Sequence, residues 1–289
     1  MWERLFDVLM DAVIDSVKLL PFLFATYLVM ELIESRAGEK TEALVRKSGR
    51  FGPVIGGVLG VVPQCGFSAA AANLYAGRVI TAGTLLAVFW STSDEMLPIL
   101  ISEMTNHVTV GLIIRILLIK AIIAVIAGMA VDLVIQKKQR EESHLHIHDL
   151  CEHDHCHCER GVLYSAFSHT MQIFIFIFLI TFVLNMVIDV VGEDTISGLV
   201  LNRPFLGEIL AGLVGLIPNC ASSVVLTRLY LEGAMSGGAL AAGLLVSAGV
   251  GILVLCRVNR HPMENAKLIA ILYVVGILAG MLVGTLNIL

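Results

Sequence analysis

A proline-centred motif that occurs twice constrains the fold more than any other feature of the sequence. Residues 60–68 read GVVPQCGFS, and residues 215–223 read GLIPNCASS. The two prolines lie 218 − 63 = 155 residues apart, and at that offset, without a gap, Cys65 coincides with Cys220 and several flanking glycines coincide as well. The sequence therefore predicts that the molecule consists of two related halves.

Each copy of the motif interrupts a long apolar run with a proline, an amide, a thiol and hydroxyl groups. Proline ends a helix and unsatisfied backbone groups are costly in lipid, so such an interruption usually lines a cavity. Corresponding breaks in two halves of a membrane protein point to a binding site for a transported substrate. The alternative to a binding site is a helix that is only kinked at proline, with the cysteine packed in the core. The presence of two copies in register makes this alternative less favoured. The predicted substrate-binding residues are Gln64, Cys65, Ser68, Asn219, Cys220, Ser222 and Ser223.

The composition indicates a polytopic integral membrane protein. Of the 289 residues, 57% are hydrophobic, and the mean hydropathy is +0.88. Several windows approach the roughly 20 apolar residues that cross a bilayer. No basic stripe with interleaved aromatic residues is present, which excludes nucleic acid as a partner. The N-terminal sequence MWERLFD lacks the features of a secretory signal, so the first hydrophobic segment is expected to be retained.

The paired motif also carries a resemblance to a known family. PQCGFS and PNC, embedded in a chain of this length and hydropathy, resemble the family of ten-transmembrane heavy-metal exporters, whose members are labelled manganese transporters or arsenic efflux proteins. The resemblance extends over nearly the whole chain. It implies export of a metal or metalloid ion, and it does not fix which ion.

Charged loops predict the topology of the first half. The loop at residues 35–50 and the loop that opens at Lys137 are both rich in Lys and Arg, so both are expected on the cytoplasmic side. An even number of crossings must separate them. Each arm of the element at residues 52–76 has about a dozen residues and spans about 18 Å, too short for a hydrocarbon core of roughly 30 Å. A re-entrant hairpin followed by two spans, at residues 79–101 and 107–135, satisfies the count.

The second half is expected to repeat this plan, with a hairpin at residues 207–230 and spans at 162–191, 236–256 and 268–289. A first apolar segment at residues 8–33 gives the first half three crossings as well, so the second half is inverted relative to the first. The predicted fold is all-α, with two inverted repeats that each hold three spanning helices and a proline-broken re-entrant hairpin, ten hydrophobic segments in total. The predicted domains are the repeats at residues 1–135 and 161–289, joined by a cytoplasmic loop at 136–160, with both termini external.

Charged side chains inside the apolar segments are further candidates for function. Asp94 and Glu95 interrupt the span at residues 79–101, and an intramembrane carboxylate is a functional candidate because its charge is costly there. Either acid is predicted to bind the cation or a coupling proton; the alternative is a salt bridge between Asp94 and Arg115. Lys120, near mid-depth, is expected to repel a bound cation, to help bind an oxyanion, or to lie against a hairpin carbonyl.

A segment rich in histidine and cysteine lies in the loop between the halves and is predicted to bind a transition metal. Imidazole and thiol groups at this density favour zinc, nickel, cobalt or copper, although their spacing fits no standard four-ligand site. We expect this segment to collect or sense metal on the cytoplasmic side; a merely solvated linker is the weaker alternative. The predicted ligands are His144, His146, His148, Cys151, His153, His155, Cys156, His157 and Cys158.

The sequence therefore predicts a secondary-active transporter in the cell membrane that exports a heavy-metal or transition-metal cation, such as manganese or zinc, in exchange for protons. Sulfur ligands favour soft ions and oxygen ligands favour manganese, so the ion stays open. No nucleotide-binding loop is present, and neither a required cofactor nor enzymatic activity is expected. The alternatives are an arsenite or organoarsenical permease and a membrane-tethered metal sensor. An intramembrane metallohydrolase is disfavoured because the spans contain no HExxH helix.

Overall fold

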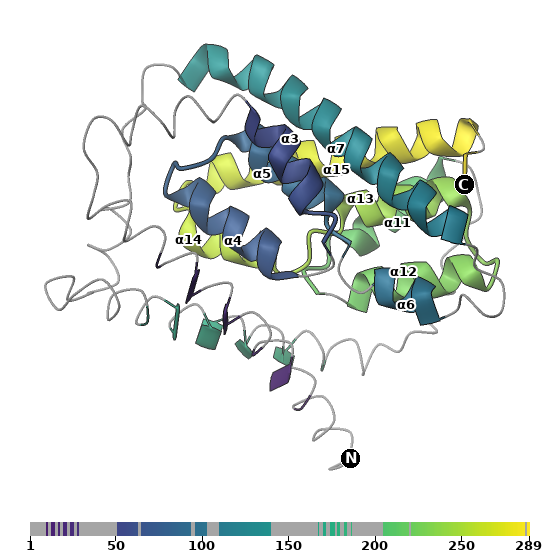
Figure 1. Cartoon of the computed structure of the whole chain (residues 1–289), viewed down its shortest axis with the longest axis horizontal. Helices are drawn as coiled ribbons and strands as arrows, with labels where there is room; N and C mark the ends of the chain where they lie inside the picture. Colours follow the sequence, from purple (N-terminus) through teal and green to yellow (C-terminus); the bar gives the residue numbers. More distant parts are fainter. Residues whose placement is uncertain are drawn as a thin grey trace, which may run out of the picture.

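The computed structural model is helical, as predicted, over the part of the chain that it describes (Figure 1). That part comprises residues 51–62, 65–93, 96–102, 110–139, 205–219, 221–286 and 288–289, together with single positions and short runs between residues 10 and 28 and between 167 and 186.

Five helices are described between residues 52 and 139, and local signals mark the starts of two of them. Pro53 lies in the first turn of α3, where its missing N–H has no cost, and the Thr81 hydroxyl caps α5 by accepting a hydrogen bond from the Thr84 N–H. The helices are α3 (Gly52–Leu59), α4 (Cys65–Ala76), α5 (Ala82–Ser91), α6 (Met96–Ser102) and α7 (Val110–Gln139).

The described residues from 205 onward form five helices at equivalent positions, α11 (Leu206–Gly215), α12 (Ala221–Leu231), α13 (Gly237–Val246), α14 (Gly251–Val258) and α15 (Pro262–Thr285). Adding 155 to the bounds of α5 gives 237–246, the bounds of α13, and adding it to the start of α6 gives 251, the start of α14. Ser236 caps α13 as Thr81 caps α5, and 81 + 155 = 236. The repeat in the sequence is therefore also a repeat of helix boundaries.

The helices form a bundle with two ends, which we name after the acidic residues found there. At the Glu264 end, Arg78 in the turn after α4 pairs with Glu264 at the start of α15, at 2.6 Å and 2.9 Å. The start of α5 lies beside the last part of α7 at the same end, because the Gly83 N–H donates to Asp132 Oδ1 at 2.8 Å. The ends of α4 and α7 and the starts of α5 and α15 therefore gather there (Figure 1).

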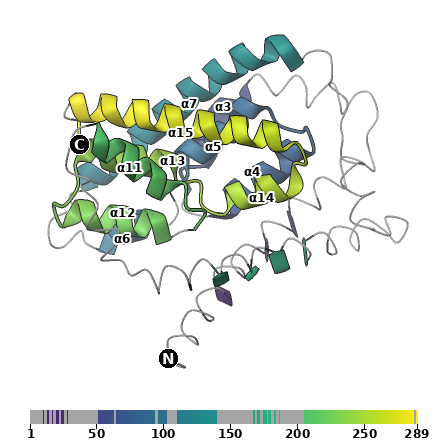
Figure 2. The same ribbon diagram turned by 180° about the vertical axis from the view of Figure 1, so that it is seen from behind.

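The Glu208 end lies at the opposite side of the bundle. Arg115 in the second turn of α7 donates to the Ile288 carbonyl oxygen at 3.2 Å, which places the start of α7 beside the residues that follow α15. A Cβ added to Gly238 at the start of α13 would lie 2.9 Å from the Cα of Gly284 at the end of α15. The equivalent helices α7 and α15 consequently run in opposite directions (Figure 2).

The two proline-centred elements are each divided into two helices, α3 with α4 and α11 with α12. Gly52 at the start of α3 contacts Thr84 at the start of α5, and Gly60 just after α3 contacts Ser91 at the end of α5. Because α4 leads back to the start of α5, it returns to the end of the bundle from which α3 began. In the second half, Gly215 at the end of α11 packs against Gly243 and Ser247 at the end of α13. Both elements therefore have the geometry of a hairpin.

The segments at residues 79–101 and 236–256, each expected to be one continuous helix, are both interrupted. The first divides into α5 and α6 and the second into α13 and α14. We call residues 92–95 the α5/α6 break and residues 247–250 the α13/α14 break. Neither break contains a proline, and at Gly249 the backbone adopts a φ of +53°, which glycine accepts without strain. The expectation of one continuous helix was therefore wrong for both segments, and in the first of them Pro98 lies in the first turn of α6, just after the break.

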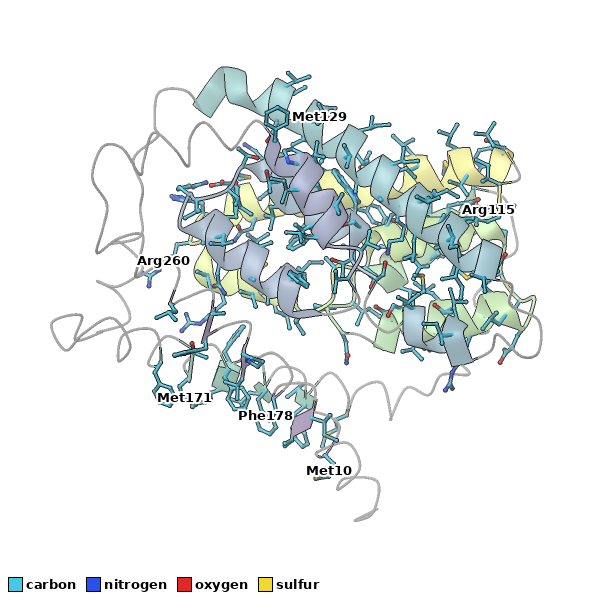
Figure 3. All side chains as sticks on the ribbon, in the orientation of Figure 1. Met10, Arg115, Met129, Met171, Phe178 and Arg260 are labelled. Atoms are coloured by element: carbon cyan, nitrogen blue, oxygen red, sulfur yellow. The ribbon has the colours of Figure 1, made fainter. Side chains whose placement is uncertain are left out.

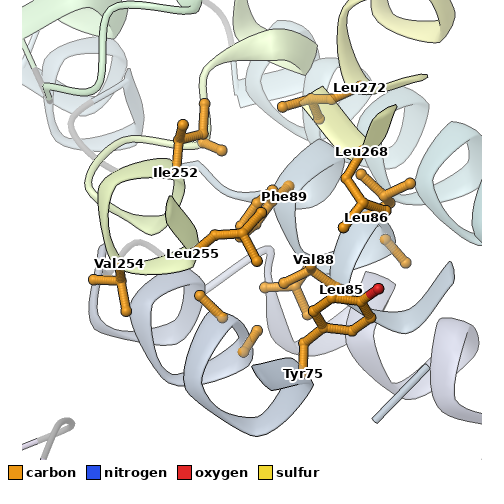
Figure 4. Close-up of a cluster of buried hydrophobic side chains, with 14 of the residues drawn as sticks. Tyr75, Leu85, Leu86, Val88, Phe89, Ile252, Val254, Leu255, Leu268 and Leu272 are labelled. Atoms are coloured by element: carbon orange, nitrogen blue, oxygen red, sulfur yellow. The ribbon is translucent and has the colours of Figure 1, made fainter. Parts of the chain in front are cut away.

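The second helix of each hairpin, α4 or α12, packs against a helix of the other half. Helix α4 of the first half packs against α14 of the second, and α12 of the second half packs against α6 of the first, while α5 and α13 contact each other. The core between α4, α5 and α14 includes Leu85, Phe89 and Leu255 (Figure 4). Trp90 links α5 to α15 by donating from Nε1 to the Leu272 carbonyl oxygen at 3.2 Å. The two halves therefore share one core.

Among the described residues, three stretches are long and apolar enough to cross a membrane, Val110–Val134, Gly237–Val258 and Pro262–Thr285. Helix α7 exposes an apolar stripe at a spacing of four residues, Ile114, Leu118, Ile122 and Ile126. Met129 continues this exposed surface (Figure 3). Water would not favour such a surface, whereas lipid does, so the fold is that of a polytopic membrane protein.

Candidate functional site

The interruptions between the helices meet in the interior of the bundle. The hydroxyl of Ser222, in the first turn of α12, lies 3.3 Å from the hydroxyl of Ser247 in the α13/α14 break. From the other hairpin, Ser68 in α4 approaches the same break, since a Cβ added to Gly251 would lie 2.7 Å from Ser68 Cβ. One residue from each hairpin therefore reaches the α13/α14 break.

The two breaks begin with equivalent residues in a similar conformation. Thr92 and Ser247 are related by the repeat, 92 + 155 = 247, and each follows the last residue of its helix with an extended backbone, φ −51° and ψ 129° for Thr92 and φ −70° and ψ 94° for Ser247. An extended residue ends the helical hydrogen-bond ladder and leaves carbonyl oxygens in the last turn without helical partners. These oxygens also carry the negative end of the helix dipole. Both breaks therefore offer groups that attract a cation.

Lys120, in the middle of α7, binds carbonyl oxygens at the C-terminal ends of both α5 and α13. Only 3% of its surface is exposed. Its Nζ donates to the carbonyl oxygen of Thr92 and, at 2.9 Å, to that of Leu244. Of the three roles considered for Lys120, the structure shows contact with backbone carbonyls, but these belong to the ends of α5 and α13 and not to a hairpin. The bundle thus already holds one buried cation at its helix breaks.

Four of the predicted substrate-binding residues are buried. Ser68, Asn219, Ser222 and Ser223 each expose 4% of their surface or less. Within the second hairpin, Ser222 Oγ donates to the Asn219 carbonyl oxygen at 2.8 Å, and the Ser223 carbonyl oxygen accepts from Thr227 Oγ1 at 2.7 Å. Among the four, Ser68 and Ser222 are the pair that the structure brings to one break.

The remaining predicted ligands of the membrane site lie outside the described residues. Cys65 begins α4, but its side chain is outside the description, as are Gln64, Asp94, Glu95 and Cys220 altogether. The salt bridge considered between Asp94 and Arg115 is therefore not tested. The nine predicted ligands of the interhelical loop, His144 to Cys158, also fall outside. Among the residues that are described, no three His, Cys, Asp or Glu side chains gather closely enough to hold a metal.

Sequence reasoning missed the part that Thr92, Leu244 and Ser247 play in this site. Two of these residues act through backbone carbonyl oxygens, which every residue carries, so their side chains gave no signal. The repeat itself held the available signal, because the 155-residue offset pairs Thr92 with Ser247. Two hydroxyl-bearing residues at equivalent positions inside long apolar segments indicate interrupted helices, since such side chains compete for backbone hydrogen bonds.

The chain also matches a known family over more than half of its length. No curated protein and no solved structure matches the chain. Residues 3–202 match the ArsP_2 family, which is described as "Putative, 10TM heavy-metal exporter". The match covers the first motif and the loop between the halves and ends before the second motif. On this match, and with the apolar spans of the bundle, the chain belongs to the ArsP_2 family of ten-transmembrane heavy-metal exporters.

Proposed function

We propose that the protein is a secondary-active transporter that exports a heavy-metal or transition-metal cation across the cell membrane in exchange for protons. Membership of a family named for heavy-metal export supports the class of function. The observation that carries the proposal is the binding of the Lys120 ammonium by carbonyl oxygens at the ends of α5 and α13, because it marks a buried site that accepts positive charge. Broken helices at mid-depth commonly hold the substrate in such carriers.

An inverted arrangement of the two halves is part of this proposal. Equivalent helix bounds at an offset of 155 residues, the opposite directions of α7 and α15, and the exchange of α4 and α12 between the halves all support it. If each hairpin arm is counted, the segments would number ten, in line with the family description. Alternating access then follows from rocking one half against the other around the breaks.

The substrate is proposed to bind between the two motifs and the α5/α6 break. Ser68, Asn219, Ser222 and Ser223 would contribute hydroxyl, amide and carbonyl oxygens, and Gln64, Cys65, Cys220, Asp94 and Glu95 are the proposed further ligands. Either Asp94 or Glu95 would balance the charge of the ion or carry a coupling proton. The mixture of sulfur and oxygen donors suits manganese, zinc or a similar borderline ion.

The loop between the halves is proposed to face the cytoplasm and to deliver metal to the membrane site. Its imidazole and thiol groups would load on the side from which an exporter takes its substrate. The basic residues of the flanking loops support this orientation, with both termini external.

Flux into proteoliposomes tests the proposal. The purified protein would be reconstituted with an imposed pH gradient and offered manganese, zinc, cadmium and arsenite in separate assays. Uptake of at least one divalent cation that depends on both protein and gradient is expected. A proton-coupled carrier is contradicted if no ion is taken up, or if the uptake of every ion tested is the same with and without the pH gradient.

An arsenite or organoarsenical permease is the second candidate, favoured by the motif thiols and by the positive charge of Lys120. Transport of arsenite without any divalent cation in the same assay would establish it. A membrane-tethered sensor is a third candidate. Deleting His144 to Cys158 separates it from a carrier, because a carrier keeps residual flux and a sensor loses its response entirely.

A further inference from the structure

Glu208, in the first turn of α11, presents a buried carboxylate that lacks a partner. Only 4% of its surface is exposed, and its Oε2 atom accepts no hydrogen bond within the described part of the chain. An ionised carboxylate is costly to bury without a partner, and a bound proton or cation removes that cost. Neither the sequence motifs nor the family match points to this residue.

Asp132 provides an internal comparison, because it occupies the matching place at the other end of the bundle. Gly83 and Gly238 are equivalent in the repeat, 83 + 155 = 238, and each lies in the first turn of its helix. Asp132 accepts hydrogen bonds from the Gly83 N–H at 2.8 Å and from Thr81 Oγ1 at 2.7 Å. Glu208 packs against Gly238 in a similar way: a Cβ added to Gly238 would lie 2.7 Å from Glu208 Oε1, and one added to Gly83 would lie 2.5 Å from Asp132 Oδ1. In the described part of the chain, however, Glu208 Oε2 accepts no hydrogen bond.

The repeat places these two acids on different helices. Asp132 belongs to α7, and Glu208 belongs to α11, where the first half has Pro53 at the equivalent position, 208 − 155 = 53. The two acids contact equivalent glycines from helices that are not equivalent. An alignment of the two halves therefore does not pair Asp132 with Glu208. Each oxygen of Asp132 accepts a hydrogen bond, whereas Oε2 of Glu208 accepts none in the described part of the chain.

The start of α13 also offers a place for the charged form of Glu208. The first N–H groups of a helix have no partners within it, and here the Ser236 hydroxyl binds the N–H of Ala239 and leaves that of Gly238. A carboxylate next to a helix N-terminus is stabilised by the dipole. Asp132 already accepts from the N–H of Gly83, and Glu208 packs against Gly238, the equivalent residue of the second half.

Neighbouring elements place few titratable side chains in this corner, and α7 contributes Arg115, which donates to the Ile288 carbonyl oxygen at 3.2 Å. Helix α13 has no titratable side chain, and α15 has none after Tyr273, which donates to the Ile209 carbonyl oxygen at 3.2 Å. The carboxyl end of Leu289 lies beside Gly237. The titratable side chains of α12 and the turn after it are Arg228, Tyr230 and Glu232. None of these groups forms a hydrogen bond or an ion pair with Glu208 in the part of the chain described.

We propose that Glu208 is a proton-binding site that takes up and releases one proton in each transport cycle. Its role in coupling rests on the proposed transport function, whereas its protonation does not. A proton is favoured over a metal ion because the described surroundings provide one carboxylate and glycine backbone, too few ligands for a divalent cation. The carboxylic acid forms when the helix start withdraws from Glu208, and the carboxylate forms when the Gly238 N–H approaches it.

Flux through the full-length protein in proteoliposomes tests the coupling role, with Glu208→Gln as the variant and Asp132→Asn as the control. Glu208→Gln is expected to lower metal flux driven by a pH gradient by about tenfold or more, while metal–metal exchange at equal pH changes by less than about twofold. Asp132→Asn should lower both modes together through loss of stability. Unchanged gradient-driven flux in a folded Glu208→Gln protein overturns the coupling role. If the glutamine variant does not fold, Glu208→Asp replaces it in the test. This variant keeps a carboxylate, so it should retain flux driven by the pH gradient, with a pH dependence shifted from that of the wild type.

Infrared difference spectra recorded while the pH changes test the proton site without any flux. The carboxylic-acid C=O band is expected in the unaltered protein and in Asp132→Asn, and it should be lost in Glu208→Gln. Absence of metal flux in the wild-type protein would refute the proposed function. The infrared band would then still show whether Glu208 binds a proton. Identical spectra for the wild type and Glu208→Gln at every pH overturn the site itself.

Discussion

Arg78 and Glu264, 186 residues apart in sequence, form a two-pronged ion pair that joins the two halves at one end of the bundle. The Tyr75 hydroxyl donates to the same carboxylate. The hydrogen bonds to Glu264 raise the pKa of Arg78 above its ordinary value, so the guanidinium stays charged. Both side chains are about three-quarters buried, at 24% and 25% exposure, which limits screening by water.

Loss of this pair should destabilise the bundle. Glu264→Gln removes the charge that holds Arg78 and Tyr75, and hydrogen bonds to charged groups contribute about 2 kcal/mol each, reduced here by partial exposure. We expect a lower midpoint of thermal unfolding in detergent for Glu264→Gln. A conserved midpoint would show that the ion pair adds nothing to the contact between the halves.

The backbone at Arg78 permits a sharper comparison. Arg78 has a φ of 59°, and its equivalent in the repeat, Gly233, has a φ of 74°, with 78 + 155 = 233. A left-handed conformation costs a non-glycine residue about 1 kcal/mol, so Arg78→Gly should be less destabilising than Arg78→Ala by about that amount. Equal stability of the two variants would contradict the view that the ion pair holds Arg78 in a strained conformation.

The motif cysteines should be needed for transport if they contribute ligands. Cys65→Ala and Cys220→Ala are each expected to lower metal flux by about tenfold, the loss for one ligand of several. Cys256→Ala is the matched control, because Cys256 is an exposed free cysteine in α14, away from the breaks. Flux that survives in the double variant Cys65→Ala/Cys220→Ala would remove both thiols from the substrate site.

Close contact between α5 and α7 depends on small residues. A Cβ added to Gly128 would lie 2.7 Å from the Gly83 carbonyl oxygen and 2.9 Å from Ala87 Cβ, so backbone would have to move. Gly128→Ala should therefore lower stability by about 1–3 kcal/mol through overpacking, whereas Met129→Ala, on the lipid-facing side of the same helix, should change it little. Thermal unfolding of both variants checks this, and equal effects would argue against a tight α5–α7 contact.

The sequence predicted the features that depend on hydropathy and on proline. The broken elements around Pro63 and Pro218 are present, because proline in the interior of a helix removes a backbone hydrogen bond, and Ser68 and Ser222 reach one break. The interruptions at Thr92 and Ser247 escaped prediction, since hydroxyl side chains and glycine only weaken a helix and tertiary packing decides the outcome. A carbonyl partner of Lys120 was among the expectations, but in a hairpin; its place at the ends of α5 and α13 escaped prediction, because backbone groups acquire a role only through geometry.

Lys120 offers the most direct test of the site. Its ammonium neutralises carbonyl oxygens at the ends of α5 and α13, so Lys120→Met should expose them to a competing cation and remove a repulsive charge. We expect Lys120→Met to be less stable by about 3 kcal/mol and yet to bind manganese or zinc about tenfold more tightly, measured as the metal-dependent rise of the unfolding midpoint. Lys120→Arg, which keeps the charge, should bind metal as the wild type does. Weaker metal binding in Lys120→Met, with loss of arsenite binding, would instead favour an anion-binding role for Lys120.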